Sequence, residues 1–127
     1  MHGALNSALC AGCDHRWPIA GDMQVGQQCP ACGAPTARPD VVWFGEMPYE
    51  MDRIFDVLGR ADFFAAIGTS GNVYPAAGFV AEATRAGADT VEINMAPTIV
   101  GSEFTSSIMG PATQTVPAWV DKILKSN

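Results

Sequence analysis

The chain has 127 residues, which fits one ordinary domain. Hydrophobic residues make up 48% and charged residues 16% of it, a globular composition that excludes a disordered chain. No apolar run reaches the roughly 18 residues of a membrane-spanning helix, no secretory signal opens the chain, and the net charge of -6 disfavours nucleic acid. The expectation is a cytoplasmic protein without membrane or nucleic-acid partners.

Residues 1–40 are rich in Cys, Gly, Pro and polar residues and contain few apolar runs. Such a segment buries too little apolar area to fold unaided, so it needs a covalent or metal cross-link. Two CxxC pairs supply the ligands, Cys10 with Cys13 and Cys29 with Cys32, separated by 15 residues. This spacing is typical of a tetrahedral zinc site, and four cysteine ligands leave no open position on the metal. We therefore predict a structural zinc ion.

Other interpretations of these cysteines are weaker. Two disulfides suit a secreted domain, and a redox CxxC belongs at a strand-to-helix turn, a setting that neither pair has. His15 lies close enough to Cys13 to replace one sulfur. A zinc ribbon that binds nucleic acid would carry basic and aromatic residues; Arg16 and Trp17 fit this, whereas Asp14 and Asp22 oppose it.

Downstream, apolar periodicity predicts alternating strands and helices. Residues 41–44 form an apolar run that ends at Gly45 and reads as a buried strand. One face of a helix follows, with apolar residues at i, i+3, i+4 and i+7. These are Met51, Ile54, Phe55 and Leu58.

The rest of the chain continues the alternation. Residues 63–67 are a continuous apolar run that ends at Gly68, as in a parallel strand covered on both faces. Pro75 suits the start of a helix that stops near Gly87. Residues 91–94 predict a third strand, and 116–124 a final amphipathic helix.

This order of elements predicts an α/β fold: a partial Rossmann-like parallel sheet beside a small four-cysteine zinc ribbon. The expected division is residues 1–40 for the zinc-binding module and 41–127 for the nucleotide-binding part. The strand ends at Gly45, Gly68 and Asn94 would lie along one edge, where open α/β sheets bind ligands.

The sequence also resembles the sirtuin family, particularly its bacterial type, over essentially the whole chain. Met1-His2-Gly3 resembles the family's HG motif, and the paired CxxC module follows it at the expected distance. The other matching phrases are Val41-Val42-Trp43-Phe44-Gly45-Glu46, Gly68-Thr69-Ser70, Val73-Tyr74-Pro75-Ala76 and Gly110-Pro111-Ala112. Any one phrase is weak evidence, but their ordered combination is specific.

The resemblance implies an NAD-dependent protein-lysine deacylase (deacetylase), which transfers the acyl group from lysine to ADP-ribose and releases nicotinamide. It implies two partners, NAD and an acylated lysine peptide or protein. By the same resemblance His2 would be the general base on the ribose hydroxyl.

The resemblance assigns the remaining site residues in two groups. The residues expected to bind NAD are Gly68, Thr69, Ser70, Asn94, Met95, Ala96 and Ala112. The residues expected to clamp the substrate peptide as an added strand are Phe44, Gly45, Glu46, Asn72, Val73 and Tyr74.

One departure from the family pattern is large. The glycine-rich phosphate-binding turn and the Gln-Asn-x-Asp segment that precede the HG histidine in sirtuins have no counterpart here. The expectation is a fragment, or a chain started at an internal methionine, with weak or no turnover by itself. The alternative is a non-catalytic zinc-containing fragment that binds a peptide or protein.

Overall fold

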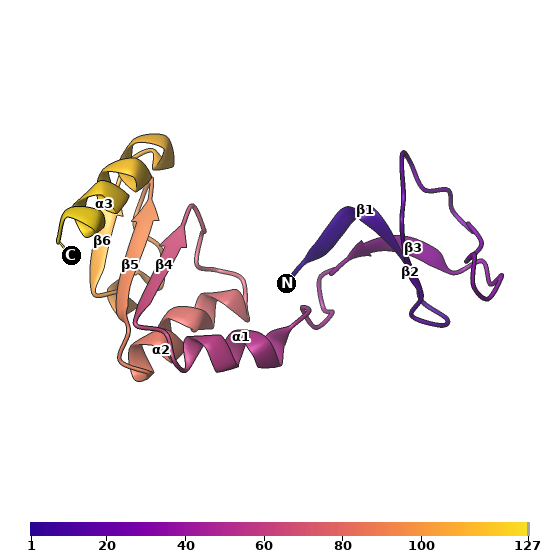
Figure 1. Ribbon diagram of the computed structural model, residues 1–127, viewed down its shortest axis with the longest axis horizontal. Helices are drawn as coiled ribbons and strands as arrows, with labels where there is room; N and C mark the ends of the chain where they lie inside the picture. Colours follow the sequence, from indigo (N-terminus) through magenta and orange to yellow (C-terminus); the bar gives the residue numbers. More distant parts are fainter. Residues whose placement is uncertain (127) are drawn as a thin grey trace. The chain divides into compact units, whose positions relative to one another are not determined.

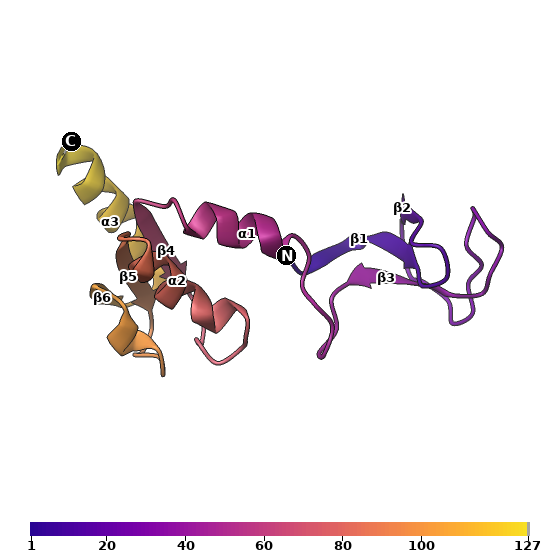
Figure 2. The same cartoon turned by 90° about the horizontal axis from the view of Figure 1, so that it is seen from below.

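The computed structural model describes residues 1–126, which form two compact units, Met1–Met51 and a second one from Asp52 onward. The first unit contains one sheet, and the second contains another sheet with its helices (Figures 1 and 2). The predicted functional division at residue 40 stays a prediction. In the described part of the chain, no helix is both long and apolar enough to cross a membrane.

The first unit is a three-stranded antiparallel sheet. β1 (Gly3–Cys10) lies in the centre and pairs with β2 (Arg16–Pro18) and β3 (Ala37–Val41). Gly3 has a φ of 83°, and a Cβ there would come within 1.9 Å of the Asp40 carbonyl oxygen, so only glycine lets these strands approach. The sequence analysis did not predict this sheet.

Asp40 joins the parts of the first unit. Its carboxylate is buried and accepts hydrogen bonds from the Ser7 hydroxyl at 3.2 Å and the Tyr49 hydroxyl at 2.8 Å. Arg16 Nε approaches the same carboxylate at 3.3 Å. Burial opposes ionisation, but these hydrogen bonds and the Arg16 charge outweigh it and lower the pKa of Asp40. All three strands are thereby tied to the segment that leaves the sheet.

The second unit contains a three-stranded parallel sheet in the order β4-β5-β6. The strands are β4 (Phe63–Ile67), β5 (Asp89–Asn94) and β6 (Ser106–Met109). α1 (Met51–Leu58) leads into β4, while η1 (Ala76–Gly78) and α2 (Phe79–Arg85) connect β4 to β5. η2 (Gly101–Glu103) precedes β6, and α3 (Ala112–Ser126) follows it.

Helices α2 and α3 cover opposite faces of the parallel sheet (Figures 1 and 2). Successive side chains of a strand point to opposite faces. Phe63 contacts Trp119 of α3, and its neighbour Phe64 lines a small cavity with Val80 of α2. Both faces of β5 are therefore covered, and Val91 and Ile93 form the centre of the core.

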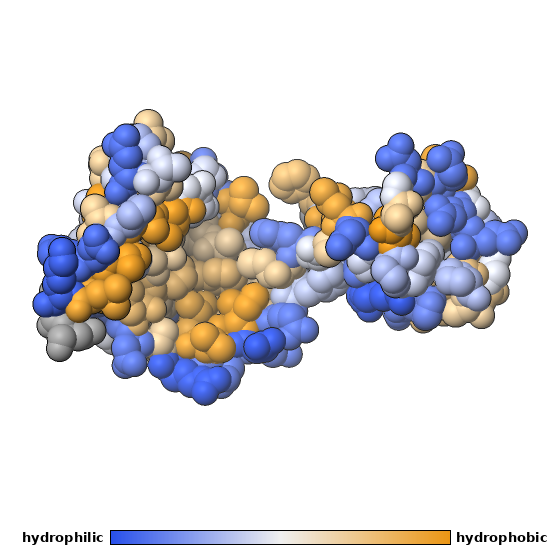
Figure 3. All heavy atoms as spheres, turned by 45° about the horizontal axis from the view of Figure 1, so that its top comes forward, coloured by the Kyte–Doolittle hydropathy of each residue, from blue (hydrophilic) through white to orange (hydrophobic). Residues whose placement is uncertain are grey.

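The β4 side of this sheet is open. Among the residues that the structure describes, β4 pairs with β5 alone, and Phe63 and Ile67 are 46% and 45% exposed. Figure 3 shows apolar side chains gathered on this unit's surface. Proteins normally pair or cover an apolar edge strand of this kind.

The structure confirms the α/β class, the parallel sheet, and the strands and helices predicted from residue 51 onward. The predicted buried strand at residues 41–44 is wrong, because β3 ends at Val41 and belongs to the antiparallel sheet. Trp43 and Phe44 are 52% and 97% exposed in the loop that follows. The third parallel strand is instead β6, whose sequence Ser-Ser-Ile-Met carries too weak an apolar pattern to be predicted.

Candidate metal centre and ligand-binding edge

The four cysteine sulfurs meet at one point of the first unit. All four Sγ atoms lie within 4.8 Å of one another, with Cys10 and Cys29 buried and the other two exposed. The Cys10–Cys32 and Cys13–Cys29 sulfurs are each 3.7 Å apart. Tetrahedral zinc with bonds of about 2.3 Å places its sulfurs about 3.8 Å apart, so the cluster fits zinc. All four cysteines are free, which excludes the two-disulfide interpretation.

The backbone of each CxxC turn supports its first sulfur. The amides of Gly12 and Ala31 each donate to a cysteine sulfur at 3.4 Å, to Cys10 and Cys29 respectively. Gly33 has a φ of 74°, which favours glycine, and a Cβ at Gly12 would lie in tight contact, 3.3 Å from Thr36 Oγ1. His15 lies outside the cluster, with its ring stacked on Trp17.

The electrostatics of the cluster favour a bound cation. A hydrogen bond with Thr36, 3.2 Å from the sulfur, is the largest cause that lowers the pKa of the Cys10 thiol to about 6. For Cys13, a backbone hydrogen bond at His15 lowers the pKa, but interactions with the other three thiols raise it to about 12. Four thiolates cannot coexist at such distances without a compensating charge, and a bound Zn²⁺ would supply it.

Thr36 is the residue at this site that the sequence analysis missed. It lies 26 positions from Cys10 in the chain, so no spacing rule could identify it; only the pairing of β1 with β3 brings the two together. Partners that hydrogen-bond to metal ligands commonly contribute 10–100-fold in metal affinity.

We expect Thr36→Val to weaken zinc binding about tenfold, because the Cys10 thiolate loses its hydrogen-bond partner while the side-chain volume is kept. Competition with a metallochromic chelator measures the zinc dissociation constant. The matched control is Thr113→Val, on the exposed surface of α3. Equal dissociation constants for the two variants would contradict this role of Thr36.

The carboxyl ends of β4, β5 and β6 are joined by hydrogen bonds. Asn94 Nδ2 donates to the Thr69 carbonyl, and the Gly110 amide donates to the Asn94 carbonyl at 2.9 Å. The Gly68 amide donates to the Ile93 carbonyl at 3.0 Å. The strand ends predicted at Gly68 and Asn94 are thus at one edge, whereas Gly45 lies in the other unit.

The side chains at this edge are accessible. Thr69, Ser70, Met95, Ala96 and Ala112 are exposed, and Asn94 is half-buried. Hydroxyls and turn amides that follow a parallel strand can hydrogen-bond a phosphate or a ribose. The structure therefore brings the seven predicted NAD-binding residues to one edge, at the ends of β4 and β5 and the start of α3.

The other predicted residues are divided between the units. His2 lies beside β3, since its carbonyl accepts from the Val42 amide at 3.0 Å, and the segment from Phe44 to Glu46 follows in the same unit. Asn72, Val73 and Tyr74 belong to the second unit, between β4 and η1. All of these side chains are exposed.

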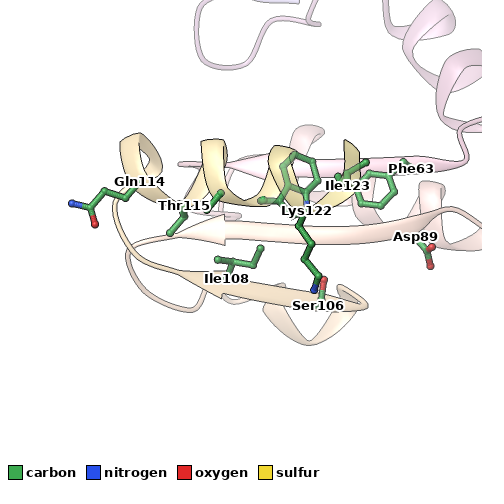
Figure 4. A pocket seen from close by; sticks show the side chains of 10 residues that line it. Phe63, Asp89, Ser106, Ile108, Gln114, Thr115, Lys122 and Ile123 are labelled. Carbon is green, nitrogen blue, oxygen red and sulfur yellow. The ribbon is translucent and has the colours of Figure 1, made fainter. Parts of the chain in front are cut away.

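The second unit also has a groove that the sequence analysis did not predict (Figure 4). Its volume is about 770 Å³, and it lies under α3. Phe63, Asp89 and Ser106, the first residues of the three strands, line it together with Trp119 and Lys122 of α3. Ile108, Gln114 and Thr115 also line it, so the groove runs along the sheet face under α3, from the amino ends of the strands to the start of α3 (Figure 4).

Comparison with known proteins gives one consistent family. Residues 1–75 match the Sir2 family. The chain is 50% identical over 125 residues to an NAD-dependent protein deacylase of Caulobacter vibrioides, covering 98% of this chain and 52% of that protein. It is 52% identical over 126 residues to an NAD-dependent protein deacylase of Salmonella typhimurium, covering 98% of this chain and 46% of that protein. The chain therefore spans about half the length of the curated relatives it matches.

Solved structures agree. A complex of a Sir2 homologue with NAD superimposes with a TM-score of 0.86 at 32% identity, covering 98% of this chain and 50% of that chain. A Sir2 protein bound to a propionylated peptide shares the fold, with a TM-score of 0.78, 22% identity and coverage of 95% and 54%. With more than half of its residues matched to the family and its fold shared with solved members, the chain belongs to the Sir2 family.

Proposed function

We propose that this chain carries the zinc module, the general base and the C-terminal part of the NAD site of an NAD-dependent protein-lysine deacylase. The observation that carries the proposal is the identity of about 50% to NAD-dependent protein deacylases over 98% of the chain. The exposed edge formed by Gly68–Ser70 and Asn94 supports it, because it offers hydroxyls and amides at the ends of parallel strands.

The residues have distinct roles in this proposal. The zinc ion is structural and holds the antiparallel unit together, since four cysteines leave it no position for a substrate. NAD supplies the ribose that receives the acyl group as nicotinamide leaves. His2 removes the proton from a ribose hydroxyl, a reaction for which an imidazole is suited near neutral pH. The residues at the carboxyl edge of the parallel sheet hold the nucleotide, namely Gly68, Thr69, Ser70, Asn94, Met95, Ala96 and Ala112.

The peptide-binding residues form two exposed segments, one in each unit. Phe44, Gly45 and Glu46 of the first unit, and Asn72, Val73 and Tyr74 of the second, are the residues that we propose to contact the acylated lysine peptide. The net charge of -6 agrees with a peptide or small-molecule partner and not with nucleic acid. We propose a cytoplasmic location without a membrane partner.

An assay of nicotinamide release tests the proposal. Because the deacylases related to this chain are about twice its length, we expect little turnover of NAD and an acetyl-lysine peptide by the 127-residue chain alone. Turnover is expected when the portion of the Caulobacter relative that has no counterpart here is added as a second polypeptide. Robust turnover by the chain alone would contradict the need for that portion.

A binding measurement tests the proposal without requiring that the two polypeptides assemble. Adding ADP-ribose to the isotope-labelled chain should shift the amide resonances of Gly68, Thr69 and Asn94, because they flank the proposed nucleotide site. The amides along β1 should not shift. If turnover is absent from the mixture and no shift occurs at this edge, the proposed function is wrong.

A further inference from the structure

The loop of residues 42–46, which follows β3, is held by Arg38. The two terminal nitrogens of the Arg38 guanidinium contact the two carboxylate oxygens of Glu46, with Nη2 at 2.9 Å from Oε2. Nη2 also donates to the Val41 carbonyl at 2.8 Å. The Arg38 side chain is only 17% exposed. A two-pronged contact of this kind fixes both distance and orientation, which a single ion pair does not.

Trp43 closes the same loop from the other side. The guanidinium carbon of Arg38 lies 3.6 Å from the centre of the Trp43 ring, so the cation stacks on the indole. The Trp43 amide donates to Glu46 Oε2 at 2.9 Å, and the Glu46 amide donates back to the Trp43 carbonyl at 3.0 Å. The Arg38 hydrogen bonds are the main cause that lowers the pKa of Glu46 to about 2. Both carboxylate oxygens of Glu46 thus accept hydrogen bonds from Arg38 or Trp43.

Phe44 is the residue that this arrangement leaves uncovered. It lies between Trp43 and Glu46, and 97% of its surface is exposed, while Gly45 beside it has a φ of 89°. A phenylalanine in this position contributes nothing to the core of the unit, and its exposure is unfavourable. The five-residue loop is therefore held in one conformation by its other residues, while the apolar Phe44 side chain is exposed.

We infer that the side chains of Arg38 and Glu46 are positioning groups, which hold loop 42–46 so that Phe44 contacts the acylated lysine peptide while the Glu46 carboxylate itself does not. This inference rests on the proposed function. In the segment Phe44-Gly45-Glu46, which sequence reasoning treats as three peptide-binding residues, the Phe44 side chain is the contact and the Glu46 carboxylate is its support. Arg38, which sequence reasoning did not select, becomes part of the peptide site.

The physical argument is that the cluster orders the loop more than it stabilises the unit. Ion pairs at a surface contribute little to global stability. Hydrogen bonds to a charged group, however, hold a local backbone conformation, and removing one of them typically changes an equilibrium about tenfold or more. Losing the cluster should therefore release the loop and leave the sheet intact.

The test uses two variants. Arg38→Lys keeps the positive charge but loses the two-pronged contact with the carboxylate, and Glu46→Gln keeps the side-chain shape but loses the negative charge. The matched control is Arg60→Lys, which alters an exposed ion pair with Asp56 in the other unit. The first measurement is amide hydrogen exchange. Arg38→Lys should speed exchange of the Trp43 and Glu46 amides about tenfold and leave the β1 amides unchanged, and Glu46→Gln should act in the same direction.

The second measurement is the kinetic effect in the mixture of polypeptides that supports turnover. Arg38→Lys should raise KM for the acetyl-lysine peptide about tenfold with kcat nearly unchanged, because only peptide binding is affected. Phe44→Ala should raise KM at least as much while leaving exchange at Trp43 and Glu46 unchanged. An NMR titration should show the pKa of Glu46 rising toward its ordinary value in Arg38→Lys.

Four outcomes would count against the inference. The proposed support of the loop is wrong if the Trp43 and Glu46 amides exchange at the same rate in Arg38→Lys as in Arg60→Lys. The peptide role is wrong if exchange rises while KM stays constant, or if Phe44→Ala leaves KM unchanged. A wild-type mixture without any acyl-peptide turnover contradicts the proposed function and, with it, the peptide role, and the exchange data then decide the loop support by themselves.

Discussion

Stripping zinc from the four-cysteine cluster is expected to unfold residues 1–51 while the parallel sheet of the second unit stays folded. The buried apolar side chains of the first unit are few, namely Ala8, Leu9, Cys10 and Cys29, and two of these are metal ligands. Burying a leucine contributes about 1.5–3 kcal/mol. A structural zinc ion in a small domain contributes about 10–16 kcal/mol, so the metal dominates the stability of this unit.

Metal analysis and two-dimensional NMR with and without a strong chelator measure this effect, since resonances of the two units are counted separately. Cys29→Ser should unfold the same unit. The control is Ala31→Ser, which introduces the same side chain two positions away at an exposed site that is not a ligand. Acidification should act like the chelator, because zinc binds thiolates and its affinity falls as the thiols take up protons. A first unit that stays folded after the metal is removed would overturn the assignment.

His2→Ala is expected to lower the rate of acyl transfer about 10²- to 10⁴-fold, the usual contribution of a general base, with KM for the peptide nearly unchanged. The fold should not respond, since the His2 side chain is exposed and its backbone carbonyl, which the substitution keeps, accepts from the Val42 amide. Formation of the deacylated peptide in the mixture of polypeptides that supports turnover measures the rate of acyl transfer, and circular dichroism checks the fold.

The chain offers a matched control for this experiment. His15 is the second of its two histidines, it is also exposed, and it lies in the same unit with its ring stacked on Trp17. His15→Ala should keep the rate of the wild-type mixture. Equal rates for His2→Ala and the wild type would exclude His2 as the base and would favour a chain that binds a peptide without chemistry.

The metal site and the second unit were predictable for different reasons. The spacing of the two CxxC pairs identifies the candidate ligands from the sequence, because the two cysteines of each pair lie within a single turn. The run at residues 63–67 and the stripe of Phe79, Val80 and Ala83 also carry their periodicity locally, and the structure confirms both elements. The antiparallel sheet escaped prediction because its strands are mostly polar: Ala37–Val41 contains Arg38, Pro39 and Asp40.

The apolar run at residues 41–44 shows the limit of pattern reading most clearly. Its composition is that of a buried strand, yet the segment turns outward, because Arg38 and Glu46 hold it as a loop. Those partners are eight positions apart and have opposite charge, which is common along any chain and predicts nothing by itself. The polar residues of Ser106–Met109 instead complete the parallel sheet, because β5 offers them a free edge.

By itself the sequence predicted the four cysteines whose sulfurs the structure brings together, the α/β class and the strand ends at Gly68 and Asn94, since each of these depends on residues close together in the chain. Only the tertiary structure decided which strands share a sheet, that Thr36 supports Cys10, and that Arg38 orders the loop that exposes Phe44. Those contacts join residues that the folded backbone brings together, and no local spacing encodes the path of the backbone between them.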